Sequence, residues 1–398
     1  MQKRFPGLSL LAGLAIVVSA CSSGATASPS AAPSSAASPS AAASASPSAA
    51  ASASASAAAS ASSLKIGVVT DVGTINDKNF NEYSYKGAVA AAAKLGAPSV
   101  QYVVPAGQSD YAKDIKGFVD QNYNIIVTVG FNLGTETIKA AKANPNIWFI
   151  AVDVAPCVTP TGDPDSTFAC KGDAATLLPK LIGIQFQENQ AGYLAGIVAA
   201  AVSKTGVIGQ IGGINNNPAV VKYLQGYILG AQSYNPNIKV ETAFFSTGDT
   251  NKAYNDPVWG KTFSQQFITQ KKVDVLFQVA GKTGNGALDA ACAANIIGIG
   301  VDVDQYLSYP SADKCLVTSA EKHLSTAVSS TIQAIASGVA KGGIAKYDAT
   351  NDGVGYSPFH NTAITIPADV QGKLDTALAG MKAGTLKTCP DKCGTWTP

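Results

Sequence analysis

Hydrogen-bonding and aromatic side chains gather in one loop of the N-terminal half. Asp71, Asp77, Phe80 and Asn81 follow residues 64–70 (LKIGVVT), an apolar stretch typical of a buried strand. Carboxylates and amides suit the vicinal hydroxyls of a sugar, and an aromatic face suits a planar base. The loop therefore favours a binding site for a small polar molecule. From spacing alone, Phe80 fits a role in helix packing equally well.

A second pair of carboxylates, Asp302 and Asp304, follows the apolar stretch 296–301 (IIGIGV). In α/β proteins, ligands gather at the carboxyl ends of parallel strands. We therefore expect this loop to face the same ligand as the loop after residue 70. Paired aspartates can also serve in acid–base catalysis, but loop carboxylates are common, and we assign this pair no catalytic role.

The sequence holds no catalytic pattern with the required spacing. Its two histidines, His323 and His360, leave little for a nucleophile–histidine arrangement. Two Gly-Lys-Thr triplets, at 260–262 and 281–283, lack the glycine that a P-loop places before them. The segment 284–286 lacks the third glycine of a dinucleotide fingerprint. We therefore expect a binding protein without cofactor or metal, and not an enzyme.

Strand-like and helix-like stretches alternate through most of the chain after residue 64. The rhythm breaks near residues 177–185 and then resumes, which gives two halves of similar size. This alternation predicts parallel sheets with helices on both faces, so we expect an α/β fold of two Rossmann-like lobes joined by a hinge. The cleft between the lobes is the expected ligand site. The expected strands are 64–70, 100–104, 124–129, 148–152, 207–211, 240–245, 273–278 and 296–301.

The remaining chain must return across both lobes, so we place crossovers near residues 180, 303 and 345. The ligand-binding domain then spans residues 64–398, a length that is large for one core and suits two lobes. Lobe 1 comprises about 64–180 and 304–345, and lobe 2 comprises about 181–303 and 346–398.

The first 63 residues differ in composition from the rest. Residues 1–20 have a basic start and a short apolar run, and they end in Val-Ser-Ala before Cys21, which resembles the lipobox of bacterial lipoprotein signals. This pattern predicts an acylated Cys21 that anchors the protein on the extracytoplasmic face of the cell membrane. An ordinary secretory signal is the alternative. Residues 21–63 are almost entirely Ala, Ser and Pro, which predicts a disordered tether or a glycosylated stalk.

Six cysteines remain beside Cys21, an even number in a chain expected outside the cytoplasm, where disulfides persist. Of the fifteen possible connectivities, the pairing of near neighbours is the most economical. A zinc site at 389–393 is disfavoured because no second ligand pair follows it. The net charge of +2 comes without a basic cluster, so we expect no nucleic acid partner, and no second apolar stretch predicts a membrane span. The expected disulfides are Cys157–Cys170, Cys292–Cys315 and Cys389–Cys393.

A series of motifs resembles the basic membrane protein family, the purine-nucleoside receptor lipoproteins of ABC importers. Each motif is short, but together they cover nearly the whole folded region in the order of the family. They are 71–82 (DVGTINDKNFNE), 187–196 (QENQAGYLAG), 211–213 (IGG), 226–231 (GYILGA), 255–261 (NDPVWGK), 278–286 (QVAGKTGNG), 300–305 (GVDVDQ), 318–322 (TSAEK) and 358–360 (PFH).

This resemblance implies the type I periplasmic-binding fold and a nucleoside base held between two aromatic rings. The rings would be Phe80 and Tyr254, although the family has Phe or Trp at the second position. Asp71 and Asn81 match positions that contact base or ribose, and Asp302 matches a ribose contact. The candidate ligand-binding residues are Asp71, Asp77, Phe80, Asn81, Asp153, Tyr254, Gly281, Asp302 and Lys322.

The resemblance further implies a monomeric receptor that closes on its ligand by a hinge and delivers it to the permease subunits of an ABC importer. Three alternatives stay open: a receptor for a sugar or another small molecule, a ligand sensor feeding a signalling system, and an enzyme such as a nucleoside hydrolase. A sugar site needs a polar rim but no pair of aromatic faces. A metal-dependent hydrolase needs a dense aspartate cluster near the N-terminus, which this sequence lacks.

Overall fold

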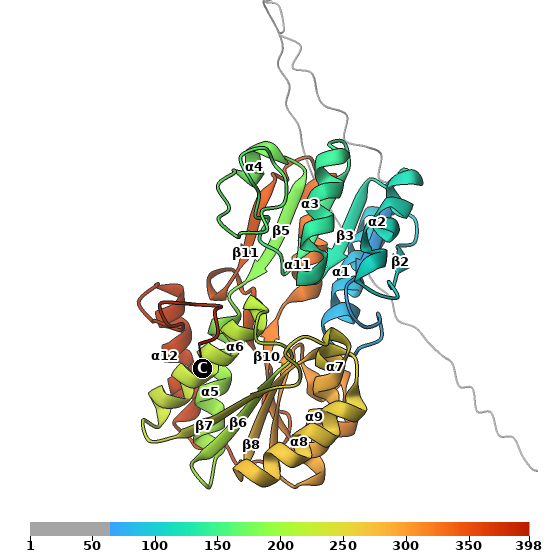
Figure 1. The fold of residues 1–398 in the computed structure, drawn as a ribbon. Helices are drawn as coiled ribbons and strands as arrows, with labels where there is room; N and C mark the ends of the chain where they lie inside the picture. Colours follow the sequence, from blue (N-terminus) through green and yellow to red (C-terminus); the bar gives the residue numbers. More distant parts are fainter. Residues whose placement is uncertain (1–63, 398) are drawn as a thin grey trace, which may run out of the picture. The chain divides into compact units, whose positions relative to one another are not determined.

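The computed structural model describes residues 64–397; the expected signal peptide, Cys21 and tether lie outside this range. The described chain forms two α/β lobes, each built on one six-stranded sheet (Figure 1). All strand pairs in the two sheets are parallel except one, at the edge of the second sheet. The expected α/β class with two Rossmann-like lobes is therefore confirmed.

The sheet of the first lobe is covered by helices on both faces. Its strand order is β11-β5-β4-β3-β1-β2. Along β1, Val68 joins the apolar cluster that includes Ala88 of α1, while its neighbour Val69 points to the other face and joins Ile115 of α2. The strands are β1 (Ile66–Thr70), β2 (Gln101–Val103), β3 (Ile125–Val129), β4 (Trp148–Val152), β5 (Leu181–Phe186) and β11 (Gly343–Tyr347). The helices are α1 (Phe80–Leu95), α2 (Tyr111–Asp120), α3 (Gly134–Ala143), α4 (Ala174–Leu177) and α11 (Leu324–Ala336).

The second lobe repeats this arrangement, with strand order β12-β10-β9-β8-β6-β7. Phe277 of β8 joins a cluster with Leu194 of α5 and Leu224 of α6, whereas Leu276 faces Ala287 of α9 on the opposite side. The strands are β6 (Val207–Gly212), β7 (Lys239–Phe244), β8 (Val275–Val279), β9 (Ile297–Asp302), β10 (Leu316–Lys322) and β12 (Val354–Tyr356). The helices are α5 (Glu188–Val202), α6 (Pro218–Tyr234), α7 (Thr250–Tyr254), α8 (Pro257–Lys271), α9 (Gly281–Ala293), α10 (Gln305–Ser308) and α12 (Val370–Lys382).

Helices α5 and α6 approach each other unusually closely, because each carries two glycines one turn apart on the shared face. These are Gly192 and Gly196 on α5, and Gly226 and Gly230 on α6. A Cβ atom at any of the four would lie only 1.9–2.1 Å from a backbone carbonyl oxygen of the other helix. The glycines are therefore a steric requirement of this contact.

The chain crosses between the lobes three times: between β5 and α5, between β10 and α11, and after β11. The crossovers expected near residues 180 and 345 are found a few residues further along the chain, after β5 and after β11. The crossover expected near 303 is wrong, because β10 pairs with β9 and residues 304–322 belong to the second lobe rather than the first. The physical reason is that the disulfide Cys292–Cys315 ties the return segment to α9.

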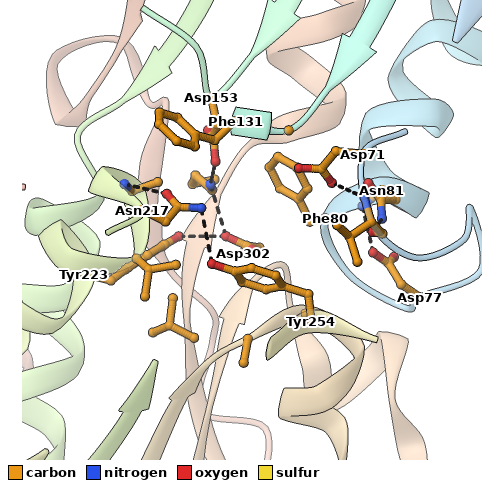
Figure 2. Close-up of a pocket in the computed structure, with 18 residues that line it drawn as sticks. Asp71, Asp77, Phe80, Asn81, Phe131, Asp153, Asn217, Tyr223, Tyr254 and Asp302 are labelled. Carbon is orange, nitrogen blue, oxygen red and sulfur yellow. Dashed lines mark hydrogen bonds and ion pairs between the residues drawn. The ribbon is translucent and has the colours of Figure 1, made fainter. Parts of the chain in front are cut away.

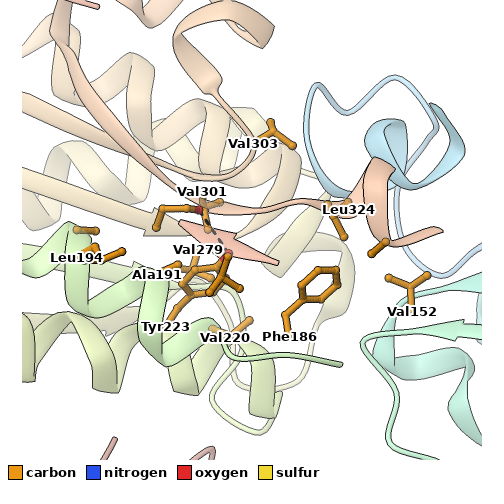
Figure 3. Packing of buried hydrophobic residues seen from close by; sticks show 14 of the residues in the cluster. Val152, Phe186, Ala191, Leu194, Val220, Tyr223, Val279, Val301, Val303 and Leu324 are labelled. Atoms are coloured by element: carbon orange, nitrogen blue, oxygen red, sulfur yellow. Dashed lines mark hydrogen bonds between the residues drawn. The ribbon is translucent and has the colours of Figure 1, made fainter. Parts of the chain in front are cut away.

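One large apolar cluster continues from the first lobe through the crossovers into the second (Figure 3). Val152 lies at its first-lobe end, Phe186 and Leu324 lie at the crossovers, and Val301 lies in the second lobe. The lobes are thus joined by buried side chains as well as by chain connections.

The three disulfides join the expected neighbours, Cys157–Cys170, Cys292–Cys315 and Cys389–Cys393. Each closes a short loop and none connects the two sheets, so they stiffen local segments and leave the crossovers unrestrained. Among residues 64–397, no helix is both long enough and apolar enough to cross a bilayer.

Candidate functional site

The nine candidate ligand-binding residues all line one pocket at the carboxyl ends of strands from both sheets (Figure 2). Its space outside the protein atoms, including the open mouth, is about 600 Å³. Asp71 follows β1, Asp153 follows β4, and Asp302 ends β9. The other lining residues are Val72, Gly130, Phe131, Asn217, Ala219, Val220, Tyr223, Val279 and Ala280.

Asp77 builds the start of α1. Its carboxylate accepts hydrogen bonds from the backbone N–H groups of Asn79 (2.9 Å), Asn81 (2.9 Å) and Glu82 (3.0 Å). Burial raises the pKa of Asp77 to about 6, against the opposing effect of these three donors, so the carboxylate is mostly ionised at neutral pH. Because main-chain donors occupy both of its oxygens, Asp77 positions Phe80 and Asn81 and has little capacity left for a ligand.

Asp71 has a different environment in the same loop. Its carboxyl accepts hydrogen bonds from the backbone of Val72 and from the side-chain amide of Asn132, the latter at 3.3 Å. Burial raises the pKa of Asp71 to about 7, and these hydrogen bonds only partly offset the effect. The group is therefore poised near neutral pH between the protonated and the ionised form.

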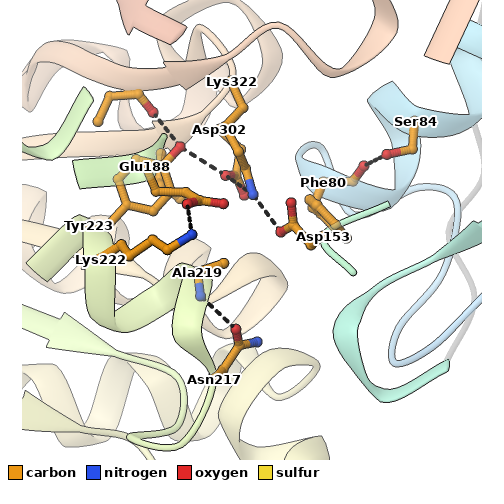
Figure 4. A network of polar contacts seen from close by, with 12 residues as sticks. Phe80, Ser84, Asp153, Glu188, Asn217, Ala219, Lys222, Tyr223, Asp302 and Lys322 are labelled. Carbon is orange, nitrogen blue, oxygen red and sulfur yellow. Dashed lines mark hydrogen bonds and ion pairs between the residues drawn. The ribbon is translucent and has the colours of Figure 1, made fainter. Parts of the chain in front are cut away.

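Lys322 lies at the centre of a buried charge network (Figure 4). Its ammonium group is 2.6 Å from a carboxylate oxygen of Asp153 in the first lobe and 3.4 Å from Asp302 in the second. Burial lowers the pKa of Lys322, but Asp153, Asp302 and Glu188 together outweigh it and raise the pKa above its usual range. The hydroxyl of Tyr223 donates to Asp302 at 3.2 Å. The ammonium is therefore permanently charged and held in place from both lobes.

Four aromatic side chains border the pocket: Phe80, Phe131, Tyr223 and Tyr254. The Lys322 ammonium lies 4.7 Å from the ring centroid of Phe80, a cation–π contact that helps to fix the ring. The hydroxyl of Tyr254 accepts a hydrogen bond from the Asn217 side chain at 3.3 Å. Aromatic faces from both lobes are thus available to a planar ligand (Figure 2).

Two acceptor atoms in the pocket lining are buried without a hydrogen-bond partner among the described residues: the side-chain oxygen of Asn81 and one carboxylate oxygen of Asp153. The Asn81 amide nitrogen donates to the Val72 carbonyl at 2.9 Å, which fixes the orientation of the amide. Buried acceptors are nearly always satisfied in native proteins. The site therefore suits a ligand that brings N–H or O–H donors.

Sequence reasoning missed Phe131, Asn217 and Tyr223. Phe131 lies just after β3, as Asp71 lies just after β1. The tendency of ligands to bind at the carboxyl ends of parallel strands, which pointed to Asp71, could therefore have pointed to Phe131 as well. Asn217 precedes Pro218 and accepts from the backbone N–H of Ala219 as the N-cap of α6, a role its sequence context indicates. Tyr223 lies within α6, and no local pattern distinguishes it from a core residue.

Comparisons with known proteins agree with this geometry. The family model described as "ABC transporter substrate-binding protein PnrA-like" matches residues 64–375. The chain is 28% identical over 309 residues to the ABC transporter nucleoside-binding protein BmpA of Lactococcus lactis subsp. cremoris, covering 73% of this chain and 80% of that protein. It is 27% identical over 314 residues to basic membrane protein D of Borreliella burgdorferi, covering 76% and 84% respectively.

Among solved structures, an ABC transporter solute-binding protein from Aeropyrum pernix K1 superposes with a TM-score of 0.68 at 21% identity. The match covers 83% of this chain and 94% of that one. At this identity the likeness shows the fold alone. It confirms the expected two-lobe architecture, the type I periplasmic-binding fold.

Proposed function

The chain belongs to the Bmp family of PnrA-like ABC transporter substrate-binding proteins, and we propose that it captures a purine nucleoside between its two lobes. The family binds solutes for ABC transporters and does not consist of enzymes. Delivery of a small-molecule ligand to a permease follows from this membership. That the ligand is a nucleoside, that the protein is a monomer and that it carries a lipid anchor are our proposals.

The observation that carries the nucleoside proposal is the pairing of aromatic faces with buried acceptors in one pocket. A purine offers a flat face for Phe80, Phe131 or Tyr254, and N–H donors for Asp71 or the free oxygen of Asn81. Ribose offers vicinal hydroxyls for Asp302. A free pentose has no planar group for the three rings. The name of the Lactococcus relative, a nucleoside-binding protein, supports the same ligand class.

We propose that binding proceeds by hinge closure. The ligand first contacts the residues of one lobe, and the second lobe then closes over it and excludes water. Closure brings Asp153 of the first lobe to Lys322 of the second, so the ammonium is held where it can contact the ribose. Capture involves no covalent step, and all of the binding groups are side chains and backbone of this chain.

The test is calorimetric titration of the full chain with guanosine, inosine, guanine and free ribose. If Phe80 stacks on the base, Phe80→Ala weakens guanosine binding by roughly 1–3 kcal/mol, the scale of one base–aromatic stack. Asp302→Asn weakens guanosine more than 2′-deoxyguanosine if its partner is the 2′-hydroxyl. Phe168→Ala is the matched control, because Phe168 is 70% exposed and does not line the pocket.

Tight binding of free ribose that does not depend on a base contradicts the nucleoside proposal and favours a sugar receptor. Undiminished guanosine affinity in Phe80→Ala assigns that ring to helix packing. Release of free base during incubation with guanosine would indicate a hydrolase.

A further inference from the structure

Three buried side-chain amides form a continuous chain in the second lobe, outside the ligand pocket. They belong to Gln278 after the middle of β8, Gln305 at the start of α10 and Asn285 in the first turns of α9. Their exposed fractions are 0%, 0% and 3%. Gln278 donates to the side-chain oxygen of Gln305 at 2.7 Å, and Gln305 donates to that of Asn285 at 2.9 Å.

Backbone groups fix the direction of this chain. The side-chain oxygen of Gln278 accepts from the backbone N–H of Ala280 at 3.1 Å, and that of Gln305 accepts from Val301 at 2.9 Å. Each amide must therefore turn its nitrogen toward the next residue. As a result, Asn285 presents its N–H donors, and not its oxygen, at the far end.

The donor at the far end crosses to the other lobe. The amide nitrogen of Asn285 donates to the backbone carbonyl of Asp77 at 3.0 Å, in a buried contact. Asp77 is the residue whose carboxylate holds the start of α1, with Phe80 and Asn81 (Figure 2). A second bond, from the Ser308 hydroxyl to the Lys78 carbonyl at 2.9 Å, lies beside it at the exposed rim.

The space for this chain is built in by a glycine. A Cβ atom at Gly284 would lie 1.6 Å from the side-chain oxygen of Gln278. Gly284 and Gln305 therefore serve the amide chain. The proposed ligand contacts of Gly281 and Asp302, in the same two motifs, do not explain why Gly284 and Gln305 are present.

We propose that Asn285 is a positioning residue that latches the two lobes together when they close. It does not line the pocket, but its bond to Asp77 exists only while the loop carrying Phe80 sits on the second lobe. A bond made only in the closed state shifts the open–closed equilibrium and so slows ligand release. The proposal rests on the hinge closure of the proposed function, but not on the ligand being a nucleoside.

The test is Asn285→Asp, which keeps the size of the side chain and still accepts from Gln305, but offers an oxygen to the Asp77 carbonyl. The guanosine dissociation rate should rise about tenfold with little change in the association rate, as expected for one buried hydrogen bond lost after closure. Asn237→Asp, at an exposed turn of the second lobe, is the matched control and should leave both rates unchanged.

Two readouts separate a latch from a general loss of folding. Protonation of the introduced carboxyl at low pH restores a hydrogen-bond donor. The dissociation rate of the variant, divided by that of the unmutated protein, should therefore fall toward one as the pH falls. In the ligand-free protein, energy transfer between one dye on each lobe should report a smaller closed fraction for Asn285→Asp, whatever the natural ligand is.

An unchanged closed fraction together with an unchanged dissociation rate overturns the latch, and so does a rate ratio that does not respond to pH. Failure of the unmutated protein to bind guanosine contradicts the nucleoside proposal alone, and the ligand-free measurement then decides the latch.

Discussion

Asp71 and Asp77 show how one loop gives two carboxyl groups different tasks. Both are buried, but three main-chain N–H groups donate to the two oxygens of Asp77, whereas Asp71 accepts hydrogen bonds from Val72 and Asn132. Since the pKa of Asp71 is raised to about 7, its folded-state proton is lost as the pH rises through neutrality. The contribution of this proton to ligand-free stability is complete below the ordinary carboxyl pKa of 3.8 and is lost as the pH rises from there through about 7.

Ligand binding should therefore release protons near neutral pH. N–H donors of a purine favour the ionised form of Asp71, so they lower its pKa and expel the proton. Guanosine affinity should rise from about pH 6 to about pH 8, and the binding enthalpy at about pH 7 should depend on the ionisation enthalpy of the buffer. Calorimetry in two buffers measures this. Asp71→Asn should abolish the dependence and Asp352→Asn, at an exposed position, should keep it; proton uptake would contradict the assignment.

At the residue scale, the sequence was a good guide to position and a poorer guide to role. All nine candidates line the pocket, and each lies at a strand end, in a family motif or, for Tyr254, directly before one. Asp77 was grouped with the ligand contacts because capping of α1 depends on a backbone turn that residue types alone do not reveal. Tyr223 was missed because it reaches the pocket from inside a helix, through the packing of α6.

At the scale of elements, the contact of α5 with α6 links helix packing to the pocket. The first turns of α6 carry Val220 and Tyr223, which line the pocket, and Gly226 lies one turn further along, where its Cα faces the Asn189 carbonyl. Any added volume there must push α6 away from α5, and the pocket wall moves with it.

Gly226→Ala should therefore lower both stability and affinity. The added methyl group overpacks the contact, which typically costs about 1–3 kcal/mol of unfolding free energy, and guanosine binding weakens as Tyr223 shifts. Gly372→Ala on α12 is the matched control: it is exposed with open space around it, so alanine should stabilise that helix by about 1 kcal/mol and leave binding unchanged. Thermal melts and titration check both; equal melting points for the two variants would refute the close-contact argument.

The alternation of elements was read correctly from the sequence except at β5, which forms where the rhythm was expected to break, and the other errors came from packing. The helix α9 begins at Gly281, within the glycine-rich segment 281–286 that looks like a loop in the sequence, because its glycines let α9 lie against α8. The crossover placed near residue 303 ignored a constraint already in the sequence. The expected bridge Cys292–Cys315 holds residue 315 beside α9, and the strand that follows, β10, pairs with β9 in the second sheet.

For the whole molecule, the proposed lipid anchor determines where the two lobes operate. Cys21→Ser should remove the acylation site, so the protein should leave the membrane fraction and appear in the medium or periplasm. Fractionation followed by immunodetection measures this, and Ser22→Ala beside the acylation site serves as the control that should stay anchored. A Cys21→Ser protein that stays with the membrane would refute the anchor while leaving ligand binding untouched.

The three crossovers also set the order in which the protein can be completed during synthesis. The first sheet receives its edge strand β11 from residues 343–347, and the second receives β10 and β12 from residues 316–322 and 354–356. Until the ribosome has made this late segment, both sheets lack strands, and α1 lacks its neighbour α11. For the proposed export route, this order means that both sheets stay incomplete until the last quarter of the described chain, from residue 316 on, has been made.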